Sequence, residues 1–390
     1  MFKVAKLNAI AAIGLARLPD SDYVISDELD AADAIVLRSA DLHARTLPAS
    51  VLAVARAGAG TNNIPVAALS ERGVPVFNAP GANANAVKEL VLAGMLMAAR
   101  HIDEALAFVA GLDAGDGLDA RVEAEKKRFN GSELEGKTLG VIGLGAIGVR
   151  VANAAYALGM RVIGYDPHMT VDGAWQLDAS VQRAASPQEL YAASDYVSFH
   201  VPLVDATRGL FAHESLSVAK PGLVVLNFAR NGIVDVDAVL AGIDGGRIGA
   251  YVTDFPTAAL LGHPRVLALP HLGASTGEAE ENCAVMVIEQ LRQYLEHGDI
   301  RHSVNFPNTR MPRSGSARLC IANRNRPNMI GQLSQALGEA GANIAQMRNA
   351  SRGELAYNLI DLDAPAPAGL EAAIAAIEGI LSVRLLANAD

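Results

Sequence analysis

The sequence predicts an α/β protein with two doubly wound parallel-sheet domains and a smaller C-terminal module of the βαββαβ type. Short β-branched or apolar runs alternate with Ala- and Leu-rich stretches from Ile35 onward, as in βαβ units around a parallel sheet. A glycine triplet, Gly143, Gly145 and Gly148, lies between one such run and a helical stretch. Residues 317–390 follow the order strand, helix, strand, strand, helix, strand.

The first βα series is predicted from the runs AIVLRS, VLAVARAGAG and GVPVFNAP. A helical segment then places Leu90, Met97 and Leu106 at helical spacing, and it is long enough to connect two domains. The second series begins with KTLGVIGLGAIG and continues through RVIGYDP, DYVSFHVP, GLVVLNFAR, GAYVTDF and RVLALPH. These runs suit the parallel sheet of a nucleotide-binding domain.

The C-terminal third contains a predicted helix from about Ala279 to Glu296. The following segment, 307–316, is rich in Pro, Arg, Ser and Gly, and is predicted to be a linker. The module at 317–390 then begins with the strand ARLCIAN and the helix Met329–Glu339. We therefore expect this module to form a separate domain.

Composition excludes several classes of protein. At 390 residues the chain should form two or three domains, and its net charge of −10 argues against nucleic acid as a partner. Cys283 and Cys320 lie in apolar runs, which favours packing over a disulfide. No apolar run is long enough for a membrane span, and no signal peptide is apparent, so we expect a cytoplasmic protein without membrane contact.

The glycine triplet predicts a dinucleotide site. It has the G-x-G-x-x-G spacing directly after the strand TLGVIG and before the helical run VRVANAAYAL, so that the helix start can receive a pyrophosphate. Asp166 ends the next strand, where a carboxylate binds both ribose hydroxyls and would repel a 2′-phosphate, so NAD is favoured over NADP. The predicted cofactor residues are Gly143, Gly145, Ala146, Ile147, Gly148, Asp166 and Pro202.

Two further residues suit hydride transfer from a secondary alcohol. Such a reaction needs a base for the hydroxyl proton and a cation for the neighbouring carboxylate. Arg230 follows the strand GLVVLNFA and His271 follows RVLALP, and Rossmann-type sheets place their chemistry beyond such strand ends. We therefore predict Arg230 and His271 as the catalytic pair.

With NFARNGIVD, YVTDFP and PHLGAST, the chain resembles the D-isomer-specific 2-hydroxyacid dehydrogenases, and PHLGAST with NAPGANANAVKEL is most similar to the phosphoglycerate dehydrogenases among them. The resemblance implies NAD-dependent oxidation of 3-phosphoglycerate to 3-phosphohydroxypyruvate, the first step of serine biosynthesis. Arg230 would bind the substrate carboxylate, His271 would be the general base, and Asp254 would lie beside the nicotinamide carboxamide.

The resemblance also implies a flavodoxin-like substrate domain that is discontinuous, at 1–97 and 285–306, and a Rossmann NAD-binding domain at 98–284. The substrate would be a small phosphorylated hydroxy acid, with Arg38 and Arg56 at its phosphate end. The implied substrate-binding residues are Arg38, Ser39, Arg56, Gly58 and Asn83.

The chain departs from the family pattern at two places near the catalytic residues. The family commonly has an acid that hydrogen-bonds the catalytic His a few residues after the Asp of its DFP-like segment, whereas this chain has Ala258 and Ala259 there. We expect activity to survive with a shifted pH profile, unless Glu278 or Glu281 takes the place of that acid. The other departure is Asn231, where Gly is usual; Asn tolerates a left-handed turn.

Residues 317–390 resemble the ACT domain, a ferredoxin-like amino-acid-sensing module, through NRPNMIGQLSQAL and GANIAQM. The resemblance implies L-serine as an effector, with Asn325 and Asn343 at its amino and carboxylate groups. Asn323 replaces a His of well-known serine-inhibited members, so serine feedback and a role in assembly alone both stay open. Exposed edge strands of such modules can pair, which predicts a homodimer or homotetramer.

Two alternative functions remain at this stage. One is another D-2-hydroxyacid dehydrogenase acting on glycerate, lactate or a 2-oxo acid, and the other is a non-catalytic NAD-sensing regulator. No metal site is expected, because the remaining histidines lack ligand spacing with Cys or carboxylates.

Overall fold

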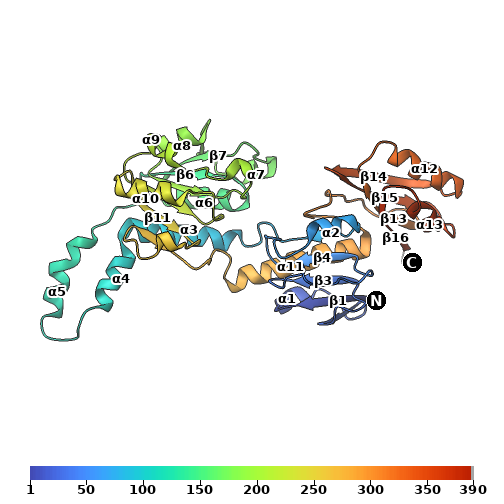
Figure 1. Cartoon of the computed structure of the whole chain (residues 1–390), viewed down its shortest axis with the longest axis horizontal. Coiled ribbons are helices and arrows are strands. Elements are labelled where there is room, and N and C mark those ends of the chain that lie inside the picture. Colours follow the sequence, from blue (N-terminus) through green and yellow to red (C-terminus); the bar gives the residue numbers. More distant parts are fainter. Residues whose placement is uncertain (388–390) are drawn as a thin grey trace. The chain divides into compact units, whose positions relative to one another are not determined.

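The computed structural model describes residues 1–387 and divides into two compact units. One unit is formed by Met1–Asn83 together with the chain from Gly277 onward, and the other by Ala84–Thr276. Each is built around a parallel sheet, so the predicted α/β class is confirmed (Figure 1).

The sheet of the Ala84–Thr276 unit has seven parallel strands in the order β12-β11-β10-β9-β6-β7-β8. They are β6 (Thr138–Ile142), β7 (Arg161–Tyr165), β8 (Gln182–Arg183), β9 (Tyr196–Phe199), β10 (Leu223–Asn227), β11 (Ile248–Thr253) and β12 (Val266–Ala268). The chain starts at the centre with β6, proceeds to one edge, and returns beside β6 with β9, which is the doubly wound Rossmann order. The six predicted strands are present; β8 escaped prediction because its two residues are exposed and show no apolar pattern.

Helices cover both faces of this sheet. They are α3 (Ala84–Arg100), α6 (Ala146–Ala157), α7 (Val171–Gln176), α8 (Pro187–Ala193), α9 (His213–Val218) and α10 (Val236–Asp244), with short 3-10 turns η2 (Asp205–Thr207) and η3 (Ala258–Leu260). One apolar core joins α3 and α6 to one sheet face, and a second core containing Leu190, Tyr191 and Val239 covers the other. Both faces are therefore buried, which explains why the strands are nearly continuous apolar runs.

An arm projects from this unit (Figure 1). The helical path of α3 is interrupted at His101, whose φ is 49°. The chain continues as α4 (Ile102–Ala110), α5 (Leu118–Glu125) and η1 (Lys126–Phe129). No residue of α4 or α5 is buried. Even the apolar side chains of Leu106 and Val109 are 64% and 59% exposed. The arm thus shows apolar side chains to solvent.

The other unit contains a five-stranded parallel sheet of order β2-β1-β3-β4-β5. Its strands are β1 (Phe2–Leu7), β2 (Tyr23–Ser26), β3 (Ala34–Leu37), β4 (Ala53–Arg56) and β5 (Val76–Phe77), and its helices are α1 (Ala12–Leu15), α2 (Val66–Glu71) and α11 (Gly277–His297). This strand order is flavodoxin-like, as predicted. The predicted helix Ala279–Glu296 is α11, extended slightly at both ends.

The C-terminal module has the predicted βαββαβ order. Its elements are β13 (Ala317–Arg324), α12 (Met329–Glu339), β14 (Ile344–Arg352), β15 (Leu355–Leu362), α13 (Leu370–Ala375) and β16 (Ile380–Ala387). The four strands form an antiparallel sheet of order β14-β15-β13-β16, and both helices pack on one face around Leu333 and Ile374.

The other face of this antiparallel sheet packs against the rest of its own unit. Cys320, Tyr357 and Leu359 share one apolar core with α11 residues such as Leu291 and with the five-stranded sheet. Within the connecting segment 307–316, Thr309 and Met311 are buried, and the Ile300 and Thr309 backbones form an antiparallel bridge. The module is thus part of a larger core within this unit.

Candidate active site

Three predicted residues follow three neighbouring strands of the seven-stranded sheet. Arg230 comes shortly after β10, Asp254 directly after β11 and His271 shortly after β12. Burial raises the pKa of Asp254, while the charges of His271 and Arg230 act in the opposite direction on that pKa. The three residues, with an imidazole, a carboxylate and a guanidinium, thus follow strand ends at one edge of the sheet; their catalytic roles stay a prediction.

The turn that presents Arg230 is held by Asn227, the buried last residue of β10. The Asn227 Nδ2 donates to the Arg230 carbonyl oxygen at 3.0 Å, and its Oδ1 accepts from the Ala229 nitrogen at 3.2 Å. The Asn227 carbonyl in turn accepts from the Thr253 hydroxyl on β11, at 2.9 Å. The left-handed residue of this turn is Gly232, with φ 87°, so Asn231 does not need the conformation we considered for it.

The loop of His271 is held by Asp254. The His271 nitrogen donates to the Asp254 carbonyl oxygen at 3.0 Å, and the Gly273 nitrogen donates to Oδ2 of Asp254 at 2.9 Å. His271 itself has φ 50°, a conformation that costs a non-glycine residue energy and that is typical of functional sites. These two hydrogen bonds keep the imidazole at the sheet edge.

The positions at which the sequence lacks the family's acid, Ala258 and Ala259, lie in η3. Within its own unit, His271 interacts electrostatically with the carboxylate of Asp254. The Phe255 ring packs beside that of His271, with the two ring centroids 5.0 Å apart. Glu278 and Glu281 belong to the other unit, so their role as replacement acids stays a prediction.

The glycine loop has the geometry that a dinucleotide requires. Gly143 has φ 89°, and a Cβ at Gly148 would lie only 1.8 Å from the Gly143 oxygen, so both positions exclude a side chain. At Gly145, by contrast, a Cβ would meet no atom within 4 Å. Nothing in the protein demands glycine at 145, which fits a backbone that a pyrophosphate approaches closely.

Ala146 and Ile147 begin α6 directly after this loop, and their backbone N–H groups have no acceptor within the helix. Asp166, which follows β7, accepts from the Leu144 nitrogen at Oδ2 and from the His168 nitrogen at Oδ1, each at 2.8 Å. Each carboxylate oxygen keeps a further lone pair for a ribose hydroxyl. The buried Oδ1 of Asp254 has no partner among residues 1–387, which fits a donor such as the nicotinamide amide.

The segment after β9 closes the glycine loop from its other side. A Cβ at Gly143 would lie 2.6 Å from the His200 oxygen and 2.7 Å from a Val201 methyl carbon. The Pro202 carbonyl accepts a hydrogen bond from the Thr207 hydroxyl at 2.5 Å, which holds the segment between these two residues in place. Burial lowers the pKa of His200 from 6.5 to about 3, so its ring is neutral.

The predicted substrate residues all lie in the Met1–Asn83 part of the other unit. Arg38 and Ser39 follow β3, and Arg56 ends β4; Asn83 precedes α3. The Arg56 Nε donates to the Arg38 carbonyl at 3.0 Å and its Nη1 to the Gly60 carbonyl at 2.6 Å. A Cβ at Gly58 would lie 2.7 Å from that Nη1, so glycine makes room for the guanidinium.

Arg38 forms an ion pair that sequence reasoning missed. Its Nη1 lies 2.7 Å from Oε1 of Glu280, in the first turn of α11. More than 240 residues separate the two in sequence, and no local pattern relates them. The pair therefore becomes visible only in the folded unit.

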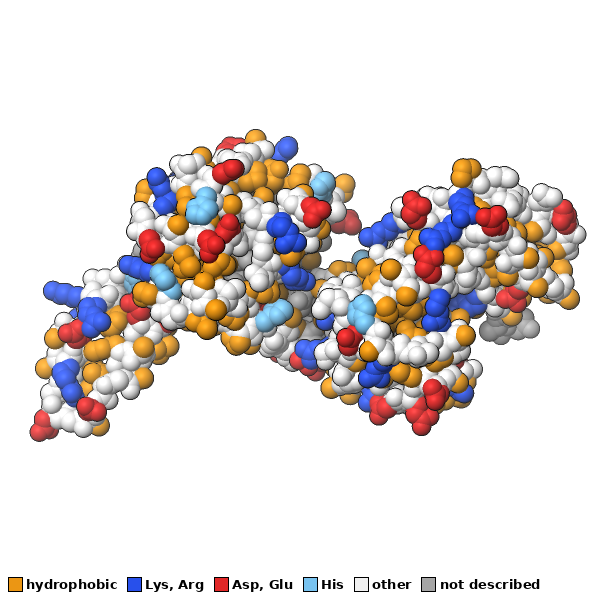
Figure 2. All heavy atoms as spheres, in the orientation of Figure 1, with side chains coloured by type: hydrophobic (Ala, Val, Ile, Leu, Met, Phe, Trp, Pro, Cys, Tyr) orange, Lys and Arg blue, Asp and Glu red, His pale blue; other side chains and the backbone are white. Residues whose placement is uncertain are grey.

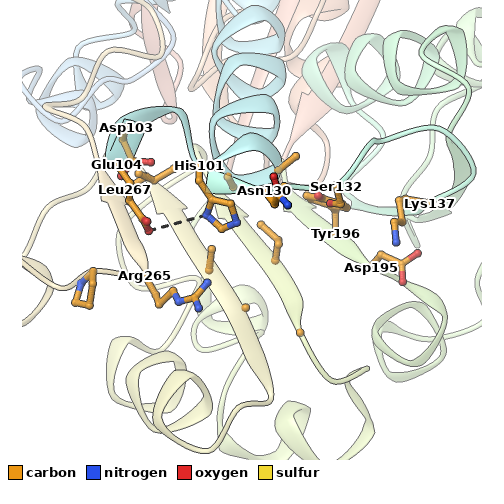
Figure 3. A pocket seen from close by; sticks show the side chains of 18 of the residues that line it. His101, Asp103, Glu104, Asn130, Ser132, Lys137, Asp195, Tyr196, Arg265 and Leu267 are labelled. Atoms are coloured by element: carbon orange, nitrogen blue, oxygen red, sulfur yellow. Dashed lines mark ion pairs between the residues drawn. The ribbon is translucent and has the colours of Figure 1, made fainter. Parts of the chain in front are cut away.

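A cavity of about 450 Å³ lies elsewhere in the Ala84–Thr276 unit (Figure 3). Its lining includes Lys137, Asp195 and Arg265, which precede β6, β9 and β12. It also includes His101, whose Nδ1 lies 3.9 Å from Oε1 of Glu104. The cavity is thus at the amino ends of the strands, the opposite edge from the cofactor and catalytic residues.

Comparison with known proteins agrees with this geometry. Residues 92–273 match the model of the D-isomer specific 2-hydroxyacid dehydrogenase NAD-binding domain. The chain is 33% identical to the D-3-phosphoglycerate dehydrogenase of Escherichia coli K12, over 84% of this chain and 79% of that protein. It belongs to the D-isomer specific 2-hydroxyacid dehydrogenase family. As a member, it is an NAD-dependent dehydrogenase.

Two further similarities place the chain within this 2-hydroxyacid dehydrogenase family. It is 35% identical to the D-3-phosphoglycerate dehydrogenase of Methanocaldococcus jannaschii, over 75% of this chain but only 55% of that longer protein. The solved glyoxylate reductase from Paecilomyes thermophila is 25% identical with a TM-score of 0.65, covering 78% of this chain and 98% of that chain. The chain is thus similar to proteins named for different substrates.

The two predicted effector residues of this family member make internal hydrogen bonds in the C-terminal module. The Asn325 Nδ2 donates to the Gly353 carbonyl at 2.9 Å, and the Asn343 Nδ2 donates to Oδ2 of Asp363 at 2.6 Å. Asn323, at the position of the family's His, is buried and accepts from the Asn358 amide at 2.7 Å. Asn325 and Asn343 thus lie in loops of the module, whereas Asn323 lies within its sheet.

Residues 1–387 contain no helix long and apolar enough to cross a lipid bilayer. The same residues hold no group of three or more His, Cys, Asp or Glu side chains arranged for a metal ion. On the face shown in Figure 2, acidic and basic side chains are interspersed without a broad basic patch.

Proposed function

We propose that this protein oxidises 3-phosphoglycerate to 3-phosphohydroxypyruvate with NAD, the first step of serine biosynthesis. The observation that supports this most directly is the convergence of Arg230, Asp254 and His271 on one sheet edge, at the same edge as the glycine loop. The relatives that match most of the chain are named D-3-phosphoglycerate dehydrogenase.

In this proposal the imidazole of His271 takes the proton of the substrate hydroxyl, and the Arg230 guanidinium binds the carboxylate through two hydrogen bonds. NAD, when bound, supplies the hydride acceptor. Asp254 positions the His271 loop through its carbonyl and Oδ2, and its remaining Oδ1 would accept a hydrogen bond from the nicotinamide amide when NAD is bound. We assign the substrate phosphate to Arg38 and Arg56.

An assay of NADH formation from 3-phosphoglycerate, with the product trapped, tests the proposal. Arg230→Ala and His271→Ala should each keep NADH binding and lose turnover by about 100-fold or more, because each removes a group used in the transition state. Variants that retain wild-type turnover would contradict the assignment.

Other substrates are the main alternative within the family. Glycerate, lactate and 2-oxo acids lack the phosphate that Arg38 and Arg56 would bind. We expect kcat/KM for 3-phosphoglycerate to exceed that for glycerate by at least about tenfold, the order of one charge-assisted contact. Equal values would favour another hydroxy acid, and no turnover with any hydroxy acid, despite NADH binding, would favour a non-catalytic regulator.

We further propose L-serine as an effector of the C-terminal module. Asn325 directly follows β13 and Asn343 directly precedes β14, and their amides would have to exchange the present internal hydrogen bonds for the ligand. Calorimetric titration with L-serine, alongside rate measurements, tests this. No heat and unchanged rates would leave assembly as the role of the module.

We propose that the protein assembles into a homodimer or homotetramer. Within residues 1–387 the edge strand β14 pairs with β15 alone, and its nine residues are partly or fully exposed. The apolar side chains of the arm, such as Leu106 and Val109, offer a second contact surface. Light scattering should give at least a dimer, and Leu106→Glu with Val109→Glu should weaken association if the arm contributes.

We also propose a cytoplasmic location, which fits two buried cysteines that form no disulfide with each other.

A further inference from the structure

The predicted phosphate end of the substrate site contains a carboxylate as well as two guanidinium groups. Arg38 and Glu280 are joined at 2.7 Å, and both side chains are partly exposed, at 36% and 44%. The carbonyl oxygen of Arg38 is held by the Arg56 Nε and by the Asn63 amide, at 3.0 and 3.3 Å. The backbone of Arg38 is thus fixed, while its side chain is held by Glu280.

The side chains of Arg38, Arg56 and Glu280 all lie near the buried thiol of Cys283, which, like Glu280, belongs to the first half of α11. Burial raises the pKa of Cys283; Arg38 and Arg56 oppose that rise, and Glu280 adds to it. Two cations and one anion thus lie around the same point of α11. A phosphate arriving there meets one net positive charge, unless it displaces the carboxylate from Arg38.

We propose that Glu280 tunes anion affinity at the substrate phosphate site: it occupies Arg38 when no substrate is bound, and a phosphate must displace it. The inference rests on the proposed function, because it assigns Arg38 to the substrate phosphate. Glu280 is a tethered competitor of the incoming anion, so each anion binds more weakly by the free energy of the Arg38–Glu280 contact.

The displacement of Glu280 costs the substrate and simple anions the same free energy. The substrate gains further contacts through its carboxylate and hydroxyl, which free phosphate and sulfate lack. Free anions have only the cations, so the same cost takes a larger share of their binding free energy. Glu280 thereby lowers the occupancy of the empty site by inorganic phosphate, while the substrate keeps its other contacts.

The variant Glu280→Gln tests this with a nearly isosteric change. We expect the KM for 3-phosphoglycerate to fall about three- to fivefold, the factor that corresponds to a partly exposed ion pair, with kcat unchanged. The inhibition constant for inorganic phosphate should fall by a similar factor. The KM for glycerate, which carries no phosphate, should not change.

A matched control lies on the same helix. Glu289 forms an ion pair with Arg17, and both side chains are partly exposed, but neither residue is at the predicted substrate loops. Glu289→Gln changes the net charge of α11 by the same amount, and we expect it to leave both constants at wild-type values.

The dependence on Arg38 is tested in an Arg38→Gln background, where Glu280→Gln should have no further effect on either constant. An unchanged KM and phosphate inhibition in Glu280→Gln would overturn the inference, as would an equal shift with and without Arg38. Loss of the proposed function itself would appear separately, as wild-type protein that does not turn over 3-phosphoglycerate. In that case calorimetric binding of inorganic phosphate to wild type and Glu280→Gln still decides the competition.

Discussion

Single side chains in this protein act largely through the backbone that they hold. Asn227 fixes the turn of Arg230 from both of its amide atoms, and Asp254 fixes the loop of His271. Neither residue needs to react. Both are buried, so each of their hydrogen bonds is expensive to break and restrains the reacting group effectively.

Replacing Asp254 by Ala should therefore lower kcat more than it changes the fold. The Gly273 N–H loses its acceptor, and the strained backbone of His271 can relax away from the sheet edge. We expect kcat to fall about 10- to 100-fold, from a lost buried hydrogen bond of roughly 1–3 kcal/mol. Steady-state kinetics measure this, with circular dichroism to confirm folding; an unaltered kcat would show that His271 is positioned without Asp254.

His200 provides a pH-dependent stability effect. Its pKa is lowered from 6.5 to about 3 by burial, with Nε2 at 2.9 Å from the Ser198 hydroxyl. The unfolded chain gains a proton below pH 6.5 that the folded chain does not, so the contribution of His200 to stability is complete above that pH and is lost towards pH 3.

The variant His200→Gln cannot take up that proton in either state. Its urea midpoint should fall less than that of the wild type when the pH is lowered from 7.5 to 5. Parallel losses in the two proteins would mean that His200 is accessible to protons in the folded state.

At the scale of elements, the β6–α6 junction separates a structural glycine from a ligand-related one. A Cβ at Gly148 would collide with the Gly143 oxygen, whereas a Cβ at Gly145 would stand in open space. Gly145 and Gly148 of the same three-glycine pattern are thus needed for different physical reasons. Sequence spacing alone cannot distinguish them.

We expect Gly145→Ala to retain the thermal stability of the wild type and to lose NADH affinity by about tenfold or more, because the methyl group meets the pyrophosphate. Gly148→Ala should lower both stability and affinity, since the helix must shift away from the strand. Fluorescence titration and thermal unfolding measure the two effects. Equal stability of the two variants would contradict the packing role of Gly148.

For the whole molecule, the main unexpected feature is how the C-terminal module is built into its unit. Arg318 is fully buried and donates to both oxygens of Asp361, at 2.6 and 2.9 Å. It also donates to the carbonyls of His297, at the end of α11, and Pro312, in the connecting segment. One guanidinium thus joins the sheet of the module to two other segments.

Removing one charge of this pair should be costly. Asp361→Leu removes the nearer carboxylate of the buried Arg318 guanidinium and leaves that of Asp299, 3.6 Å from Nη1, so we expect a loss of about 3 kcal/mol in the unfolding of this unit. The double variant with Arg318→Met should recover much of that loss. Urea unfolding of wild type, both single variants and the double variant measures the coupling; additive losses would show that the two residues act independently.

The sequence by itself determined the local structure and the residue types of the site. Apolar periodicity, glycine spacing and strand-end placement predicted both sheets, the βαββαβ module, the glycine loop with Asp166, and the strand-end positions of Arg230 and His271. These features depend on neighbours in the chain and on the rule that parallel strands end at one edge.

The tertiary structure alone decided the contacts between distant segments. The Arg38–Glu280 pair, the Arg318–Asp361 pair and the common core of the module and α11 each join side chains far apart in sequence. Such contacts arise because folding brings surfaces together by shape and burial, and no periodicity within one segment contains that information.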